Sequence, residues 1–575
     1  MAALRHPALI LVLFGSLAFA AVPSFDLVWD DLHYLHPGSA LARKSPVDLM
    51  AADWSLEGPP SGYYRPVVTL TLAAETQLFG GAPAAYHVMN VAYHLAAALA
   101  LAWAARCLLG SEIAGWLAGL VFVLHPIHTE SVAWVSGRTD VIATLFFCLA
   151  IGCYTRASGI GSLWMLGALA AAAASLLSKE PAIVLPAVLL AWELCRPRPA
   201  PRRVMDVLRR VAPFVALALG TLALRRLVLG AVAGPLVDAD ALPSRLATGV
   251  TVLGRYLLLL VAPFPANPDY VLQPLASWTS GATLVSLAAL IALGAAAAMA
   301  WRWSRVPAFL LAWLLLTALP STPLLPVGPV HMAERFLYLP SAAFAMALGC
   351  VGAAALAAAG LQAWRHLRTV SSVRALAAGG VVAGVLIASL ALTAYRCEDW
   401  RDAERLFTRM AAASPSSWKA ANGLGHVYED RGQLAAAAVE YGRATALNPA
   451  VLPPVLSLAL VESRMGLHEQ AARRADAIQR LDPEGAVALQ LAWIHSNAGQ
   501  HDEAAADLAL AAAREPGRPD TRFYQALALA RAGRRPEARA VLADAERRVE
   551  AAGPRAVGWQ PIAEQARAAV GGTRP

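Results

Sequence analysis

Two adjacent carboxylates, Asp30 and Asp31, follow the first apolar segment within the stretch Phe25-Asp-Leu-Val-Trp-Asp-Asp-Leu-His-Tyr34. A membrane helix over about 4–22 would deliver them to the bilayer surface, among aromatic side chains that suit the headgroup layer. A carboxylate held there can take a proton from a hydroxyl group or stabilise a developing positive charge. The pair could equally be solvated residues of a loop that follows a membrane anchor, and two acids alone do not decide between these interpretations.

Basic residues that could bind an anion lie in the polar segments between apolar stretches. Arginine presents a planar fork that suits phosphate, and lysine acts there as a compact point charge. Local explanations remain open, because Lys179 could pair with Glu180 and Arg335 with Glu334. The candidates for phosphate binding are Arg335, Arg138, Lys179 and Arg65.

Further polar residues lie within or beside the apolar segments. His87, Asn90 and His94 are spaced by three and four residues in an expected helix over 86–109, so they share one face. Polar groups at membrane depth either face a wet cavity or bind neighbouring helices, and the spacing leaves both roles open. The other candidates for such a network are His125, His128, Glu130, Asp140, Glu180, Glu334 and Tyr338.

A metal site is the alternative for His125, His128 and Glu130. Their spacing is not that of a helical HExxH site, and Pro126 interrupts the run. We therefore expect these side chains to form a hydrogen-bonded and ion-paired network with Arg138 and Asp140 at the ends of the helices. We expect no metal.

Composition indicates a polytopic membrane protein. Of 575 residues, 58% are hydrophobic and 15% charged, and the mean hydropathy is +0.51. The net charge of +8 comes with basic spacers at 196–210 and 365–374, which is typical of cytoplasmic loops and argues against nucleic-acid binding. None of the six cysteines has zinc-site spacing.

About eleven spans are predicted, ending with 375–395. The apolar stretch 246–261 is marginal in length, and counting it as a span would place the basic turn 301–305 outside, against the charge rule. We therefore expect it to be re-entrant or interfacial. Residues 23–85 are expected to form an external loop, and the odd number of spans places the C-terminal part outside.

The C-terminal part has a repeat of tetratricopeptide length. Prolines at 415, 449, 483 and 516 are 34, 34 and 33 residues apart, and glycines at 432, 466, 499 and 533 follow the same period. Each repeat should be a helix pair that buries its apolar side by stacking, with a concave groove that suits an extended peptide. The expected domains are a membrane domain over 1–396, repeats over 397–552, and a cap with a flexible end over 553–575.

Several short motifs occur together in one order: WDD, YRP, HxxN, HPIHTESVAWVSGRTD, SKE and ERFLYLP. The combination, over residues 1 to about 550, resembles the membrane O-mannosyltransferases that carry tetratricopeptide repeats, and their bacterial relatives. These are C-type glycosyltransferases, which take sugar from a polyprenyl-phosphate donor. The resemblance implies an all-α, polytopic C-type glycosyltransferase fold followed by an external repeat α-solenoid.

The resemblance also implies roles for the candidate residues. Asp30 would act as the base toward an acceptor hydroxyl and Asp31 would assist it. The four basic candidates would stabilise the leaving phosphate, with Arg335 first. No metal or other cofactor is implied; the partners would be the lipid-linked donor, which carries mannose or another hexose, and a protein or peptide acceptor held by the repeats. The expected location is a bacterial inner membrane, with the repeats in the periplasm or outside.

Two other functions remain open on the sequence. One is a non-catalytic, membrane-anchored repeat scaffold whose polar clusters only hold helices together. The other is a transporter of lipid-linked sugar that uses the same cavity. Substituting Asp30→Asn discriminates between the scaffold and the enzyme, because only the enzyme would lose function while still folding and inserting.

Overall fold

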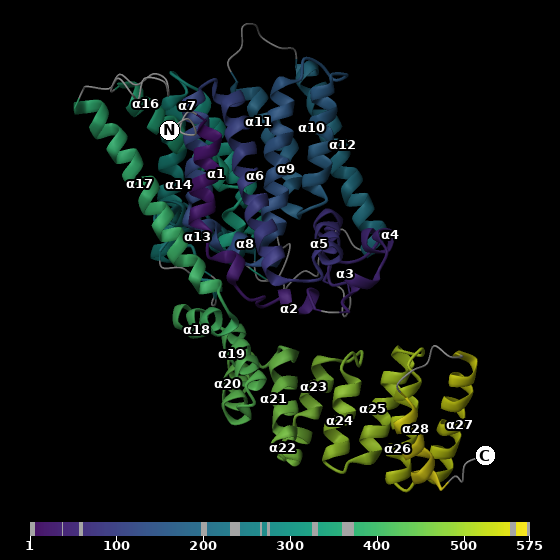
Figure 1. The fold of residues 1–575 in the computed structure, drawn as a ribbon. Coiled ribbons are helices and arrows are strands. Elements are labelled where there is room, and N and C mark those ends of the chain that lie inside the picture. The colour runs from purple at the N-terminus through teal and green to yellow at the C-terminus, as the bar shows by residue number, and fades with distance from the viewer. Residues whose placement is uncertain are drawn as a thin grey trace. The chain divides into compact units, whose positions relative to one another are not determined.

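The computed structural model describes residues 6–36, 38–56, 61–196, 204–230, 242–264, 267–272, 276–324, 330, 332–358, 373–552 and 559–571. All regular elements in these residues are helical, as the sequence predicted (Figure 1). Contacts divide the chain into a first unit, Met1–Ser414, and a second unit, Pro415–Pro575. Of the basic spacers expected at 196–210 and 365–374, the parts 197–203 and 365–372 lie outside the described residues.

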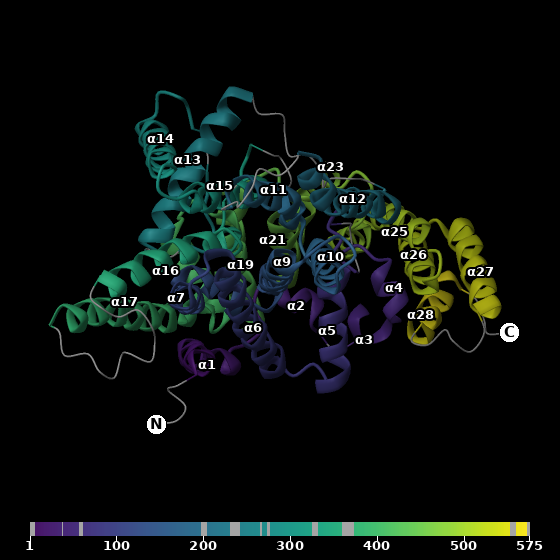
Figure 2. The ribbon, with the colours of Figure 1, turned by 90° about the horizontal axis from the view of Figure 1, so that it is seen from above.

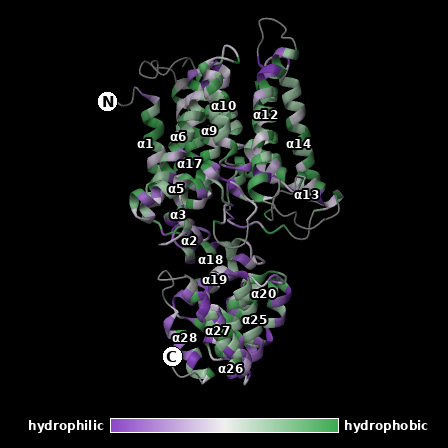
Figure 3. Ribbon diagram, turned by 90° about the vertical axis from the view of Figure 1, so that its right-hand side faces the viewer, coloured by the Kyte–Doolittle hydropathy of each residue, from purple (hydrophilic) through white to green (hydrophobic). Residues whose placement is uncertain are grey.

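The first unit is a bundle of apolar helices. Within the described residues, 8 helices are long and apolar enough to cross a membrane, and three shorter apolar helices accompany them. This is a multi-pass membrane protein, and its bundle is strongly hydrophobic along the helices and polar at their ends (Figure 3). The bundle contains α1 (Pro7–Ala18), α6 (Pro83–Leu109), α7 (Glu112–Leu124), α9 (Arg138–Arg156), α10 (Leu163–Leu176), α11 (Leu185–Cys195), α12 (Val204–Leu229), α14 (Gly281–Ala300), α15 (Val306–Ala318), α16 (Ser341–Ala358) and α17 (Val373–Cys397).

Small residues set the spacing of the central helices. A Cβ atom on Gly119 of α7 would lie 2.8 Å from the Cβ of Ala102 on α6. On α16, a Cβ atom on Gly349 would lie 2.4 Å from the backbone oxygen of Ala114 on α7. Without a hydrophobic driving force between helices in lipid, such close backbone approach supplies the packing energy.

Short elements collect at one end of the bundle, which we call the loop end. Figure 1 shows α2 to α5 and α8 there, below the long helices of the first unit. Much of the external loop predicted over 23–85 is therefore folded onto the bundle, around the buried side chains of Leu41, Val68 and Ile142. The elements of the loop end are α2 (Asp31–Tyr34), α3 (Ala40–Arg43), α4 (Pro46–Met50), α5 (Pro66–Phe79), η3 (Pro126–His128), α8 (Thr129–Ala133), η4 (Val135–Gly137), η5 (Glu180–Val184), η6 (Leu319–Ser321) and η7 (Glu334–Leu337).

The segment expected to be re-entrant or interfacial is α13 (Leu242–Val261), which with 20 residues is long enough to span and not marginal. Near its start, Arg245 Nε donates to the Pro323 oxygen at 3.3 Å; near its end, the Leu260 oxygen accepts from His125 Nε2 at 2.9 Å. Both contacts are with the loop end. Figure 2 shows α13 lengthwise where α9 and α10 are seen nearly end-on. This packing favours the interfacial placement.

The second unit consists of stacked helix pairs, as the repeat predicted. The glycines of the repeat, including Gly432 and Gly499, have positive φ at the turns within the pairs, which explains the period. Ala437, Ala471, Ala504 and Ala538 are fully buried where the helices meet. The helices are α19 (Trp418–Asp430), α20 (Leu434–Leu447), α21 (Leu452–Arg464), α22 (His468–Arg473), α23 (Ala475–Leu481), α24 (Ala488–Asn497), α25 (His501–Arg514), α26 (Pro519–Arg531), α27 (Arg535–Ala552) and α28 (Gln560–Val570). The preceding helix, α18 (Ala403–Ala413), belongs to the first unit.

Candidate functional site

The two adjacent acids lie in different environments. The Asp31 carboxylate is fully buried and accepts hydrogen bonds from Ser136 N at 2.7 Å, Ser136 Oγ at 2.6 Å and Val135 N at 3.2 Å. Burial raises the pKa of Asp31 to about 7, although these donors favour the charged form. Asp31 therefore fastens α2 to η4, and this makes it a positioning residue for its neighbour.

Asp30 lies on the surface, directly after a strained residue. Trp29 has a φ of 55°, which is uncommon for a bulky side chain. Its indole ring stacks on Trp134 at 5.6 Å and on Trp400 at 6.5 Å between ring centroids. Strained backbone persists where surrounding contacts hold it, and such positions are concentrated at functional sites. The Asp30 carboxylate is exposed at this fixed position.

Arg335 reaches the same region from η7. Its backbone N–H donates to Glu130 Oε2 at 2.8 Å, its guanidinium group pairs with the same carboxylate, and the guanidinium carbon lies 5.5 Å from the ring centroid of Trp134. Burial lowers the pKa of Arg335, but the carboxylates of Glu130, Asp140 and Asp30 raise it above the ordinary arginine value. Asp30 is therefore close enough to act electrostatically on Arg335.

The Ser-Lys-Glu turn brings further charges together. Lys179 pairs with Asp140, while Glu180 pairs with Arg65 at 2.8 Å and with Arg225 at 3.0 Å. Burial alone would raise the pKa of Glu180, but the two guanidinium groups lower it to about 2. The local pairing of Lys179 with Glu180, left open by the sequence, is therefore wrong; its physical reason is that each side chain has a partner from a distant segment.

These groups form what we call the outer charge cluster: Arg65, Glu130, Asp140, Lys179, Glu180, Arg225 and Arg335. Its four cations face three carboxylates, so without Asp30 the cluster carries one net positive charge. Its members also act on one another across the pairs: burial lowers the pKa of Lys179 most, Asp140 raises it, and Arg65 and Arg335 lower it further. With the Asp30 carboxylate counted as well, the positive and negative charges of this region balance.

Arg138 is paired elsewhere. Its side chain is fully buried; Nη1 donates to Glu75 Oε2 at 2.7 Å and Nη2 to the Tyr86 oxygen at 3.1 Å. Tyr93 Oη donates to the other oxygen of Glu75 at 3.0 Å. This enclosed pair joins α5 to α9, and sequence reasoning missed Glu75. Its burial and its pair with Glu75 leave Arg138 without an open face toward a donor phosphate, so it lies outside the proposed phosphate site.

The shared face of α6 binds neighbouring elements. Asn90 Nδ2 donates to three backbone oxygens of the turn at 132–135, at 3.1 to 3.3 Å. His94 Nδ1 lies 2.6 Å from Tyr338 Oη, and its Nε2 lies 3.1 Å from the Val123 oxygen. The His87 ring packs edge-on against Phe25 at 6.4 Å. Of the two roles left open by the sequence, these contacts favour the attachment of helices.

The histidines after α7 also have structural partners. His125 Nε2 bonds to the Leu260 oxygen, as above, and His128 Nε2 lies 2.8 Å from Ser341 Oγ. Within the described residues, no group of three or more His, Cys, Asp or Glu side chains is placed to hold a metal ion.

Glu334 also has a partner that the sequence did not indicate. Its carboxylate pairs with Arg396 of α17 and accepts from Tyr270 Oη at 3.0 Å. The local pairing of Glu334 with Arg335 is therefore wrong, because each residue is held by a different helix.

Fold and site together define a multi-pass membrane protein with an ion-paired site at the loop end and an array of helical repeats. Comparison with known sequences is consistent with this class. No protein-family profile matches the chain. It is 36% identical to mouse Protein O-mannosyl-transferase TMTC2 over 137 residues, 23% of this chain and 16% of that protein. It is 26% identical to mouse Protein O-mannosyl-transferase TMTC3 over 456 residues, 72% of this chain and 47% of that protein. The chain thus spans less than half the length of either relative.

One solved structure is an oligosaccharyltransferase from Archaeoglobus fulgidus, tethered to an acceptor peptide. It aligns with 68% of this chain and 55% of its own length, at 12% identity and a TM-score of 0.36.

Proposed function

We propose that the chain is an integral-membrane glycosyltransferase that moves mannose or another hexose from a polyprenyl-phosphate donor to a hydroxyl group of a protein acceptor on the extracytoplasmic face. The alignment with protein O-mannosyl-transferases over 72% of the chain supports this class of reaction. The observation that carries the proposal is that the exposed Asp30 and Arg335 share one region: Trp134 stacks on Trp29, the residue before Asp30, and its ring lies 5.5 Å from the guanidinium carbon of Arg335.

In the proposed reaction, the acceptor oxygen forms a bond to the anomeric carbon of the sugar while Asp30 takes the hydroxyl proton. The bond from that carbon to the phosphate oxygen breaks, and its electron pair stays on the lipid phosphate. Arg335, Lys179 and Arg65 stabilise the charge that develops there. Electrostatic stabilisation of this kind is strongest when the cations are already held in place before the reaction.

The carboxylates of the outer charge cluster supply that preorganisation. Glu130 holds Arg335, Asp140 holds Lys179, and Glu180 holds Arg65. Asp31 fixes the backbone from which Asp30 projects. The proposal needs no metal or other cofactor. It places the protein in a bacterial inner membrane, with the repeats on the outer side, where they hold the protein acceptor.

The test is to map glycans by mass spectrometry on exported proteins from cells that make the wild-type chain, Asp30→Asn or Asp26→Asn. Asp26 is an exposed acid of the same loop and serves as the matched control. We expect hexose-modified proteins with the wild type and with Asp26→Asn, and none with Asp30→Asn at equal membrane abundance. Unchanged glycans with Asp30→Asn would favour a scaffold; movement of lipid-linked sugar without any glycosylated protein would favour a transporter.

A further inference from the structure

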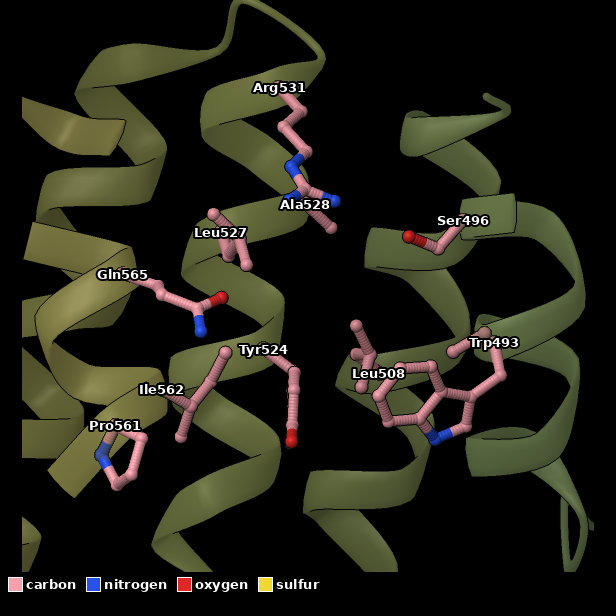
Figure 4. Close-up of a pocket in the computed structure, with 11 residues that line it drawn as sticks. Trp493, Ser496, Leu508, Tyr524, Leu527, Ala528, Arg531, Pro561, Ile562 and Gln565 are labelled. Carbon is pink, nitrogen blue, oxygen red and sulfur yellow. The ribbon is translucent and has the colours of Figure 1, made fainter. Parts of the chain in front are cut away.

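A cavity of about 420 Å³ lies among the last helices of the second unit, between α24, α25, α26 and α28 (Figure 4). Its walls include Trp493, Leu508, Tyr524 and Ile562. The indole ring of Trp493 meets the Tyr524 ring edge-on at 5.2 Å, yet 47% of Trp493 is exposed. The volume falls within the range of roughly 300–1,000 Å³ that is usual for ligand sites. A large aromatic side chain left open at such a cavity indicates a binding surface.

The rim of the cavity is polar and carries one unneutralised charge. Arg531, Ser496 and Gln565 lie around the apolar walls in Figure 4. No acidic side chain lines the cavity, and within the described part of the chain Arg531 forms no ion pair. By contrast, Arg534, three residues further on, pairs with Asp502 at 3.1 Å. The rim is therefore complementary to an anionic group.

We propose that this cavity binds an extended peptide segment that presents a bulky apolar side chain and, one to three residues later, a carboxylate. The apolar side chain would lie against Trp493 and Tyr524, and the carboxylate would pair with Arg531. The hydroxyl of Ser496 and the amide of Gln565 can bond to the peptide backbone, which main-chain recognition requires. That the bound peptide is the acceptor of the sugar rests on the proposed transferase function. That the cavity binds such a peptide does not depend on that function.

The experiment uses the full chain in detergent micelles and fluorescein-labelled heptapeptides, with fluorescence anisotropy as the readout. One set carries a central Phe or Leu and a Glu one, two or three residues later. Matched peptides carry Gln in place of Glu, or Ala in place of the apolar residue. We expect the best Phe–Glu or Leu–Glu peptide to bind with a Kd on the order of 100 μM or tighter. Replacing Glu by Gln should weaken binding about three- to fivefold, as for an exposed ion pair.

Three variants locate the binding. Arg531→Gln should make the Glu and Gln peptides bind equally, because it removes the charge that tells them apart. Trp493→Ala should weaken all peptides at least about tenfold, as loss of an aromatic anchor does. Arg539→Gln removes an exposed arginine that does not line the cavity and should change nothing. Circular dichroism and gel filtration confirm that each variant is folded.

Several results would overturn the proposal. The first is that no peptide of the set binds. The second is that the Glu and Gln peptides bind the wild type with equal affinity. The third is that Arg531→Gln leaves the difference in affinity between the Glu and Gln peptides unchanged. Concentration-dependent dimers that Trp493→Ala abolishes would show that a second copy of the chain occupies the cavity instead. Peptide binding without sugar transfer would count against the transferase alone, and sugar transfer without peptide binding would count against this site alone.

Discussion

Charged side chains do different work in the two units. In the first unit, ion pairs such as Arg138–Glu75 are buried and join segments that are distant in sequence; the two side chains are 0% and 4% exposed. In the second unit, pairs such as Arg518–Glu515 lie three residues apart on the surface, with exposures of 48% and 61%. Breaking a buried pair leaves an uncompensated charge, whereas an exposed pair contributes little. Buried ion pairs therefore hold the loop end together, whereas exposed pairs such as Arg518–Glu515 add little to the stability of the repeats.

The largest effect that tests this contrast is expected at Arg138. Replacing it by Met leaves the Glu75 carboxylate buried without its counter-charge, which we expect to destabilise the fold by about 3–5 kcal/mol. The measurement is the apparent Tm of the full chain in detergent, together with its yield in membranes. The double variant Arg138→Met, Glu75→Gln should recover part of the loss. A single variant as stable as the wild type would contradict the structural role of this pair.

Substitution of Arg335 should destabilise the fold less than substitution of Arg138, but it should have a large effect on sugar transfer. Its side chain is 14% exposed, so the loss of its pair with Glu130 in Arg335→Gln should cost about 2–3 kcal/mol. Sugar transfer should fall below detection, and Arg335→Lys should restore stability more than transfer, because lysine keeps the charge without the planar fork. Equal recovery of both properties by lysine would show that geometry at this position is unimportant.

The pH dependence of stability tests the role of Asp31. Its pKa is raised from 3.8 to about 7 by burial, so folding takes up a proton between those values. The contribution of Asp31 to stability is fully present below about pH 4 and is lost as the pH rises through about 7. The Tm of the wild type relative to Asp31→Asn should therefore increase as the pH is lowered from 8 to 5. A Tm difference that is constant with pH would show that Asp31 is charged throughout.

The smallest effect is expected in the second unit. Arg464 pairs with Glu429 at 2.5 Å, but the arginine side chain is 52% exposed. Arg464→Gln should lower stability by less than about 1 kcal/mol, and added salt should reduce even this difference. Apparent Tm values at low and high salt check this. Arg138→Met is the reference, because the effect of losing a buried ion pair should not depend on salt. A loss as large as that of Arg138→Met would remove the contrast between the units.

The same contrast explains what the sequence could predict. The repeats follow from local spacing: each turn glycine and each small packing residue recurs with the period, so the helix pairs of the second unit were predictable. The prediction that Asp30 and Arg335 share a region came from a resemblance between motifs and not from spacing. The arrangement around them depends on the three-dimensional packing of distant segments.

The partners in the buried pairs were the part that sequence reasoning missed. Glu75 gave one signal, because it is the only charged residue within α5 and a lone acid in an apolar stretch indicates a buried counter-charge. Arg225 and Arg226 gave another, because two arginines at the expected outer end of a span run against the charge rule. Proximity in sequence suggested two ion pairs that do not form. Lys179 and Glu180 are neighbours, as are Glu334 and Arg335, but each of the four residues pairs with a residue from another segment.

The central claim, that Asp30 accepts the hydroxyl proton beside cations supplied by other segments, is tested most directly with purified full-length chain in lipid nanodiscs. The donor would be a radiolabelled polyprenyl-phosphate hexose, and the acceptor a hydroxyl-containing protein found glycosylated in cells. We predict that Asp30→Asn lowers kcat at least about 100-fold with little change in donor binding, whereas Asp26→Asn retains full activity. Transfer by Asp30→Asn at the wild-type rate would contradict the account.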